Sequence, residues 1–292
     1  MRRPRSRWGL RGAATAAFVA MVAGCTFITN LDGLAGPVPP DDASLPLDGG
    51  DSALAEAASD GAATDGAACT PVTNGLLGHW TMDTASVLGT RVADTSGKGN
   101  DGTIFGAAPA IVPGRFGEAL EFPASSASST HVEVPSLSLD TAASGVTSIS
   151  LWFFRSGVGI DDVLIDIPGS PRFDLWLTGD SGHLLCFNTQ SNSDCWGIDD
   201  PDLRDRWVHV VALFHNGPLT ASEMFVDGKK RVLTCTSEPG QACDAVRTVG
   251  LPLSLGGRND FFFHGRLDDV RVYRRGLTAV EVAALHDGTA CP

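Results

Sequence analysis

The feature that most constrains this chain is a series of short apolar runs, each of strand length, that follows Cys69. The runs are rich in β-branched and aromatic residues, and clusters of Gly, Pro, Asn and Asp separate them, as in antiparallel sheets joined by turns. Asp227-Gly228 favours a hairpin, because glycine tolerates the positive φ that a tight turn requires. This part of the chain is predicted to be an all-β sandwich, with strands within HVEVP (131–135), TSISLWFF (147–154), FDLWLTG (173–179), WVHVVALF (207–214), EMFVDG (223–228) and RLDDVRVY (266–273).

One segment near the C-terminus has the period of a helix instead. Thr278 and Glu281 have the spacing of a capping box, apolar residues follow at helical spacing up to Leu285, and Gly288 is placed to end the helix. A short C-terminal helix is therefore expected.

The first 24 residues have the pattern of a signal peptide. Five Arg precede a short run of small apolar residues, which is too short to span a bilayer as a stable helix. The run ends in Val22-Ala23-Gly24-Cys25, which resembles the bacterial lipobox. This resemblance implies cleavage before Cys25 and lipidation of its thiol; an ordinary secretory signal is the alternative.

Residues 25–68 form a separate segment, which starts at the lipidated Cys. Eight acids and no bases lie between residues 26 and 68, and the later part is built from small and turn-forming residues. Such a composition buries too little apolar surface to fold, and its charges repel one another. We expect a disordered tether that holds a folded domain of residues 69–292 away from a membrane.

The charge of the chain excludes one class of partner. The formal net charge is −13, and without the signal peptide 16 basic residues face 34 acidic ones. Nucleic acid is a poor partner for such a chain, because phosphate binding needs a basic face. The seven Cys include no CxxC pair and favour disulfides in an oxidising compartment.

Several motifs in order resemble one known family. This part of the chain, from about Gly75 to His286, resembles a LamG-like jellyroll domain of the concanavalin A-like lectin/glucanase superfamily. The resemblance implies a two-sheet antiparallel jelly roll with adjacent terminal strands, often with calcium, used for carbohydrate or protein recognition. The motifs are GLLGHWTMD (75–83), DTSGKGNDGTIFG (94–106), VPGRFGEALEF (112–122), SISLWFF (148–154), RWVHVVALF (206–214), MFVDGKK (224–230) and HGRLDDVRVYRRGLTAVEVAAL (264–285).

Because this superfamily contains glucanases, the catalytic pattern of those enzymes bears on this chain. Retaining glucanases of this kind display carboxylates on one strand face as an ExDxE or ExDxxE run. No such run occurs, and the adjacent acid pairs 161–162 and 199–200 point to opposite faces when extended. No catalytic residue is therefore assigned, and a binding module is expected rather than an enzyme.

Once Cys25 is set aside, six Cys remain for disulfides. Two pairs are close in sequence, Cys186 with Cys195 and Cys235 with Cys243. The adjacent terminal strands that the resemblance implies would bring Cys69 to Cys291. These three pairings are the prediction, among the 15 that six thiols allow.

A ligand site is predicted around Trp176. In the run 173–179 Asp174 and Trp176 share one face, so a carboxylate and an aromatic ring would face a groove of the sheet together. Trp196 lies in a polar stretch taken as a loop that the Cys186–Cys195 disulfide would fix. This grouping suits a glycan, although a neighbouring loop covering Trp176 is the competing interpretation.

A calcium site is predicted where the early loop meets the last strand. Asp94 and Asn100 lie in a glycine-rich loop, and Asp83 and Asp268 are expected at the same edge. Calcium prefers such oxygen ligands, and the family resemblance adds weight. The competing interpretation is that Asp94 and Asn100 are ordinary turn residues and that Asp268 only pairs with a nearby Arg.

Together these observations predict a lipid-anchored protein of the bacterial cell envelope that displays one non-catalytic module for a glycan or protein ligand. Thr26, after the lipidated Cys, is not the Asp that marks inner-membrane retention, which favours the outer membrane. A structural or adhesion protein without glycan binding and a glycan-active enzyme are the alternatives.

Overall fold

The computed structural model describes the folded part of the chain, from Cys69 to Cys291. Several short stretches lie outside the description, as do the side chains of residues 173, 188, 189, 192–195 and 258. Residues 1–68, with the predicted signal peptide, Cys25 and tether, are also outside it. The undescribed stretches after residue 69 are 124–128, 136, 138, 140–141, 143, 156–161, 168–172, 179–182, 190–191, 236–252, 259–260 and 292.

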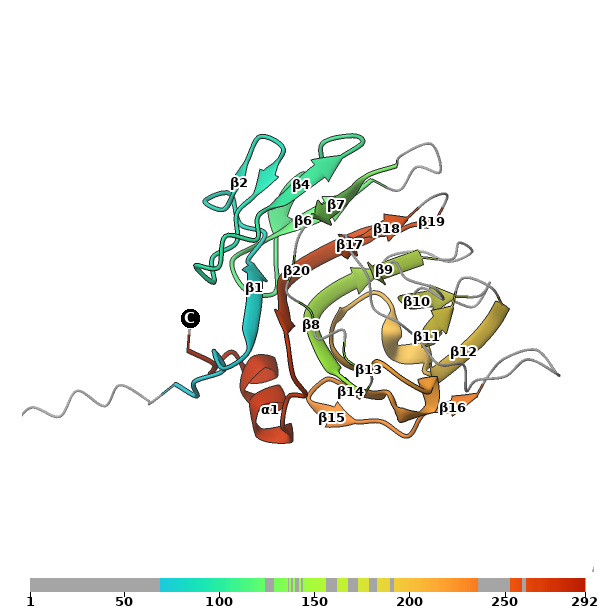
Figure 1. Cartoon of the computed structure of the whole chain (residues 1–292). Coiled ribbons are helices and arrows are strands. Elements are labelled where there is room, and N and C mark those ends of the chain that lie inside the picture. The colour runs from blue at the N-terminus through green and yellow to red at the C-terminus, as the bar shows by residue number, and fades with distance from the viewer. Residues whose placement is uncertain are drawn as a thin grey trace, which may run out of the picture. The chain divides into compact units, whose positions relative to one another are not determined.

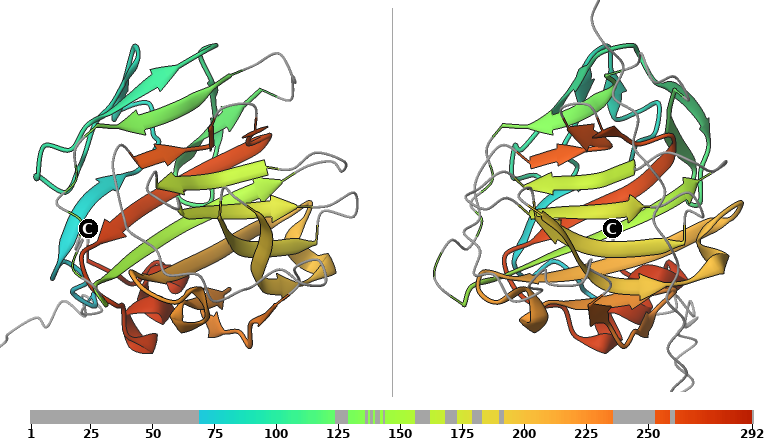
Figure 2. Two further views of the ribbon diagram at one scale, coloured as in Figure 1. Left: turned by 45° about the vertical axis from the view of Figure 1, so that its right-hand side comes forward. Right: turned by 90° about the vertical axis from the view of Figure 1, so that its right-hand side faces the viewer.

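Two antiparallel sheets form a sandwich, as predicted (Figure 1 and Figure 2). The first sheet has the order β15-β14-β13-β8-β20-β6-β5, and β1 also pairs with β20. Its strands are β1 (Leu76–Trp80), β5 (Ala110–Pro113), β6 (Glu118–Phe122), β8 (Val146–Arg155), β13 (Trp207–His215), β14 (Glu223–Val226), β15 (Lys229–Lys230) and β20 (Gly265–Tyr273).

The second sheet has ten strands in the order β16-β12-β11-β10-β9-β17-β7-β4-β3-β2. A small hairpin of β18 (Gly257–Arg258) and β19 (Phe261–Phe262) follows β17 in the chain. The ten strands are β2 (Val87–Leu88), β3 (Arg91–Val92), β4 (Gly102–Phe105), β7 (His131–Val134), β9 (Asp162–Ile167), β10 (Phe173–Thr178), β11 (Leu184–Thr189), β12 (Asn192–Asp199), β16 (Thr234–Cys235) and β17 (Leu253–Leu255).

The main core lies between the two sheets. Alternate side chains of the longer strands enter it, such as Leu175 and Leu177 of β10 and Val132 and Val134 of β7. Trp80 of β1 is fully buried in it. Because side chains alternate along a strand, the residues between these positions lie on the outer faces of the sheets.

Local signals in the sequence explain several connections. The hairpin between β14 and β15 turns at Asp227 and Gly228, both with positive φ. Two 3-10 helices, η1 (Pro201–Leu203) and η2 (Leu219–Ala221), lie before and after β13.

The one α-helix in the described part of the chain covers part of the outer face of the first sheet. Helix α1 (Ala279–Asp287) has the predicted capping box of Thr278 and Glu281, and Gly288 ends it in the left-handed conformation. Its Val282 and Leu285 pack with Tyr273 and other apolar residues in a second, smaller core. In the described residues no helix is long and apolar enough to cross a membrane.

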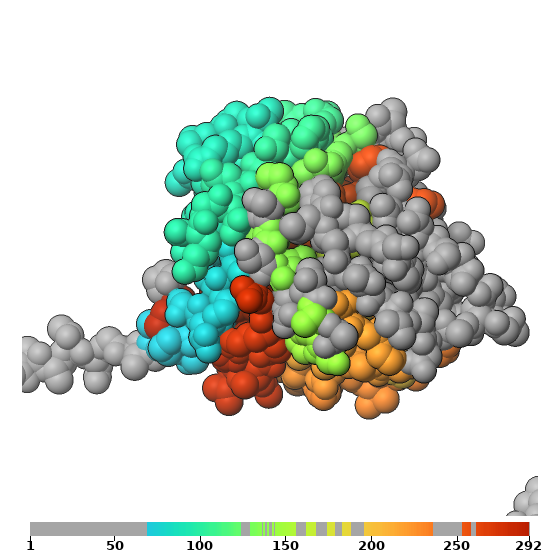
Figure 3. All heavy atoms as spheres, viewed as in Figure 1, coloured from blue at the N-terminus to red at the C-terminus, as the bar shows by residue number. Residues whose placement is uncertain are grey.

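The two ends of the domain are joined, as the sequence predicts. Strand β1 pairs with β20, Thr70 and Ala290 form a bridge, and Cys69 and Cys291 form a disulfide. Figure 3 shows the two end segments side by side, one in cyan and one in red. Cys186 and Cys235 are also disulfide-bonded. Their predicted partners, the thiols of Cys195 and Cys243, lie outside the description.

Candidate functional site

The outer face of the ten-stranded sheet carries the first two predicted ligand-binding residues. Leu175 and Leu177 enter the core, so Asp174 and Trp176 lie on the outer side of β10, as the alternation of this strand predicts. Trp176 is half-buried, whereas Asp174 is fully buried.

Trp176 belongs to one of two groups of contacting rings that adjacent residues of β19, Phe261 and Phe262, link through the backbone. Its ring centroid lies 5.1 Å from that of Phe261, and Phe262 lies 5.8 Å from His131. His131 in turn stacks on Phe105 at 5.4 Å. We call these five residues the aromatic ridge; they come from β10, β19, β7 and β4.

The ridge is accessible at more than one point. Phe105 is 45% exposed and Phe261 is 37% exposed, which is unusual for large apolar side chains in a protein with an ample core. His131 and Phe262 are half-buried. Rings gathered on one accessible sheet face form an apolar surface of the kind that marks an interaction site.

A row of polar residues runs across the same face. Strand register places Asp174 opposite Asp166, Asp166 opposite Ser254, and Ser254 opposite Glu133. Asp166 and Ser254 are buried, as Asp174 is. The carboxylate that solvent reaches in this row is therefore Glu133, with 39% of its side chain exposed and Oε1 3.3 Å from Nε2 of His131.

This geometry revises the prediction for Asp174. Asp174 points to the outer face but is fully buried, so its carboxylate is not accessible to a ligand in this structure. Glu133, Phe105, His131, Phe261 and Phe262 were missed by sequence analysis. The alternation in HVEV (131–134) was the available signal for His131 and Glu133.

The placement of Trp196 in the predicted site is wrong. The stretch that contains it is the strand β12, not a loop, and Trp196 pairs with Phe187, which is buried in the core. Trp196 packs against the core, and its Nε1 donates to the carbonyl of Ser222 at 3.4 Å. It thus lies on the opposite face of the sheet from Trp176.

The predicted calcium ligands separate into two groups. In the first, Asp94 accepts hydrogen bonds from the backbone N–H groups of His79, Ser96 and Asn100. Burial opposes ionisation, but hydrogen bonds from Ser96, His79 and Asn100 outweigh it and lower the pKa of Asp94. The Asn100 amide donates to the carbonyl of Leu77 at 2.7 Å. These residues close the loop, as the turn interpretation holds.

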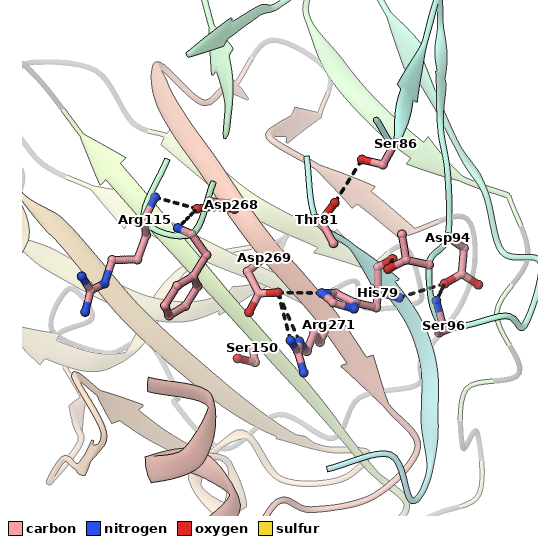
Figure 4. A network of polar contacts seen from close by, with 12 residues as sticks. His79, Thr81, Ser86, Asp94, Ser96, Arg115, Ser150, Asp268, Asp269 and Arg271 are labelled. Atoms are coloured by element: carbon pink, nitrogen blue, oxygen red, sulfur yellow. Dashed lines mark hydrogen bonds and ion pairs between the residues drawn. The ribbon is translucent and has the colours of Figure 1, made fainter. Parts of the chain in front are cut away.

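In the second group, Asp83 and Asp268 line a pocket of about 270 Å³. The register of β20 with β8 shifts between Asp268 and Arg271, a bulge in which Asp269 has a φ of 47°. The bulge turns Asp268 toward the loop at Arg115, as Figure 4 shows.

Asp268 is the unusual group of this pocket. Its Oδ2 accepts the N–H groups of Arg115 and Phe116 at 2.7 and 2.8 Å, while its buried Oδ1 has no partner. Burial raises the pKa of Asp268 to about 7, against the lowering effect of the two N–H groups, and Asp269 and Asp83 raise it further. Among the residues that the structure describes, Asp268 makes no ion pair with an Arg.

The neighbouring Asp269 is held by two partners (Figure 4). Its Oδ1 lies 2.6 Å from Nε2 of His79 and 3.2 Å from the guanidinium of Arg271. Across residues 69–291, outside the stretches named above, no three His, Cys, Asp or Glu are grouped so as to hold a metal ion. The predicted four-residue calcium shell is therefore not assembled; Asp83 and Asp268 remain together.

Residues 126–283 match a protein family described as the concanavalin A-like lectin/glucanases superfamily. The match spans more than half of the chain. The chain belongs to this superfamily. This assignment agrees with the two-sheet sandwich of the structure. No curated protein matches the sequence of this superfamily member.

Solved structures with the same fold include binding domains and glycosidases. Domain 4 of AbnA, an extracellular arabinanase from Geobacillus stearothermophilus in complex with arabinotriose, has a TM-score of 0.50 and 19% identity over 72% of this chain and 98% of its own. The binding domain of botulinum neurotoxin DC, in complex with rat synaptotagmin II, has a TM-score of 0.53 and 12% identity, over 75% of this chain and 52% of its own.

The sialidase of Trypanosoma rangeli has a TM-score of 0.52 and 16% identity, over 77% of this chain and 36% of its own. The superfamily member thus spans about half of the neurotoxin domain and about a third of the sialidase. At these identities the likeness concerns the fold alone, and function has to be argued from the site.

Proposed function

We propose that the domain is a carbohydrate-binding module whose ligand lies on the aromatic ridge. The observation that supports this most is two groups of contacting rings on an accessible sheet face, Trp176 with Phe261 and Phe262 with His131 and Phe105. Aromatic rings offer an apolar surface to the C–H faces of sugars, and nearby polar groups orient the hydroxyls. The structures with the same fold include proteins crystallised with arabinotriose or a sialic acid.

The charge beside the ridge favours a neutral glycan. Glu133 is the exposed carboxylate of the polar row, and it accepts hydrogen bonds from hydroxyl groups but repels an acidic sugar. A protein ligand that inserts apolar side chains between the rings is the second candidate.

The test is a glycan array followed by titration calorimetry on the neutral glycan that binds. Trp176→Ala is expected to weaken binding at least tenfold. Trp207→Ala is the matched control, because Trp207 is half-buried in β13 beside Phe154, in the other sheet. Equal affinity of folded Trp176→Ala and wild type would contradict the proposal.

We propose further that the module binds glycans without cleaving them. The exposed part of the polar row offers Glu133, whereas glycoside hydrolysis in most families needs two carboxyl groups flanking the scissile bond. Product analysis after long incubation with the bound glycan tests this. Released oligosaccharides that persist in a Trp207→Ala control and disappear in Glu133→Gln would instead identify an enzyme.

We also propose the lipid anchor, which the lipobox-like sequence supports, and the outer-membrane location, which Thr26 after the lipidated Cys supports. Cys25→Ala is expected to move the protein from the membrane fraction to the soluble one, because the acyl chains are lost. Sucrose-gradient fractionation distinguishes the two membranes. Membrane association that survives Cys25→Ala would contradict the anchor.

For calcium we propose a structural ion held by Asp83 and Asp268. The unpartnered, buried Oδ1 of Asp268 supports this, since a cation would satisfy it. An ion bound only by the folded state raises the melting temperature with ligand concentration. Calcium at millimolar concentration is expected to raise the melting temperature of the wild type but not of Asp268→Asn, and Asp94→Asn is expected to retain the response.

A further inference from the structure

A second pocket, lined by none of the residues of the aromatic ridge, has a charge opposite to that of Glu133. It measures about 580 Å³ and is formed by residues 73–77, the loop residues Lys98 and Asn100, and Arg274 and Arg275 at the end of β20. Its volume is within the range of pockets that hold small organic ligands.

The lining contains three cationic side chains and no carboxylate. Lys98 and Arg274 are exposed, and neither has an ion-pair partner in the part of the chain that the structure describes. Arg275 is already engaged by Glu281, in a bidentate pair, and by the carbonyl of Asn74. Two uncompensated cations therefore face this pocket in a chain whose net charge is −13.

Both cations are carried by fixed backbone. Lys98 stands between Gly97 and Gly99, both with positive φ, in the loop that Asp94 closes from within. The N–H of Arg274 donates to the carbonyl of Gly75 at 2.8 Å. The backbone positions from which the two side chains extend are thus set before any ligand arrives, while the charged groups themselves stay exposed.

The rest of the lining resembles neither a metal site nor a site for a bare ion. Leu76 and Leu77 are half-buried and give an apolar wall, while Thr73 and Asn74 are exposed and give hydroxyl and amide groups. A ligand that suits this combination has a negative group, a partly apolar body and several hydroxyls. A sugar with a carboxylate has all three.

We propose that this pocket binds a carboxylate-bearing sugar, such as a uronic acid residue of an acidic glycan, through Lys98 and Arg274. Guanidinium groups bind carboxylates in a bidentate fashion, and a lysine adds a point charge. The site is independent of the aromatic ridge, whose exposed carboxylate disfavours such a ligand.

The test uses oligogalacturonate and its methyl ester, which has the same ring without the charge. Calorimetry is expected to show that the acid binds at least tenfold more tightly than the ester. Binding of the acid is expected to weaken at high salt, because Lys98 and Arg274 are exposed and salt screens their attraction to the carboxylate. The affinity of the double variant Lys98→Glu/Arg274→Glu for the acid is expected to be at least tenfold lower than that of the wild type, whereas Trp176→Ala is expected to leave this affinity unchanged.

Lys229→Glu is the matched control, since Lys229 is an exposed lysine of β15 outside the lining. It is expected to bind like the wild type, and circular dichroism checks that every variant is folded. Equal binding of acid and ester, no binding of either, or equal losses in the control and the double variant would overturn the proposal. Inorganic phosphate that competes as well as galacturonate would overturn the assignment to a sugar.

Discussion

The two sheets differ in what lies on their outer faces. On the first sheet, helix α1 and the loop at Arg115 cover part of a layer of polar and aromatic side chains, which pair among themselves: His79 with Asp269, and Ser150 with His209. On the ten-stranded sheet the rings of Phe105 and Phe261 reach solvent. Polar residues on a sheet face therefore do not by themselves indicate a binding site. What distinguishes the two faces is that large rings remain exposed on the ten-stranded sheet, although Asp166, Asp174 and Ser254 of that face are buried.

The largest expected effect concerns the outer face of the first sheet, which α1 and the loop at Arg115 partly cover and which we call the covered face. Cys69→Ser/Cys291→Ser removes a disulfide between residues that are 222 positions apart, so the unfolded chain gains conformational entropy, which grows with the logarithm of the loop length. The free energy of unfolding is expected to fall by about 2–5 kcal/mol. Urea denaturation measures the loss. If the loss is below 0.5 kcal/mol, the packing of α1 and the pairing of β1 with β20 hold the covered face without the disulfide.

The second effect is on acid stability and also arises beneath the covered face. Burial, with the nearby charge of His286, lowers the pKa of His209 to about 3, while Asp269 and Asp227 act in the opposite direction and Arg271 lowers it further. The unfolded chain takes up a proton near pH 6.5 and the folded one does not. The contribution of His209 to the free energy of unfolding is therefore fully present above pH 6.5, and it is lost progressively as the pH falls from 6.5 toward 3.

The expected slope from this residue is about 1.4 kcal/mol of unfolding free energy per pH unit between pH 6.5 and 3. His209→Gln is expected to flatten the curve over this interval, although it lowers stability at pH 7 through repacking. His183→Gln is the control, because His183 is only half-buried. If the curves of unfolding free energy against pH were parallel for the wild type and His209→Gln, His209 would take up a proton as readily in the folded chain as in the unfolded one, which contradicts the prediction.

The smallest effect on stability is expected on the outer face of the ten-stranded sheet, where Phe105 and Phe261 are exposed. Phe105→Ser removes a ring that is 45% exposed, so the free energy of unfolding is expected to change by about 0.5 kcal/mol or less. Neutral-glycan affinity is expected to fall severalfold in the same variant. A large loss of stability with unchanged glycan affinity would contradict this prediction and would show that the aromatic ridge stabilises the fold and does not bind the ligand.

These two faces also mark what could be predicted from sequence. Alternation within one strand places Trp176 and Asp174 correctly, because it is a local property. The neighbours of Trp176 on the ridge come from β4, β7 and β19, and only the strand order brings them together. The polar composition around Trp196 predicts a loop, whereas this stretch is a strand whose pairing with β11 turns Trp196 inward.

The calcium prediction shows a similar limit. Asp94 and Asp268 were expected at one edge, and β1 and β20 are indeed neighbours. The bulge at Asp269, however, turns Asp268 toward the loop at Arg115, while Asp94 binds the backbone of its own loop. A bulge of one residue in β20 has no marker in the sequence, since Asp269 is not a glycine.

The joined ends of the domain have a mechanical consequence. Any tension transmitted along the N-terminal segment enters the fold at Cys69, and the disulfide passes it directly to Cys291. The load is then shared between the first strand and the C-terminal segment, so β1 is not peeled from the edge of its neighbour one hydrogen bond at a time. A domain pulled from this end is expected to resist as a clamped unit and to unzip more readily once the disulfide is reduced.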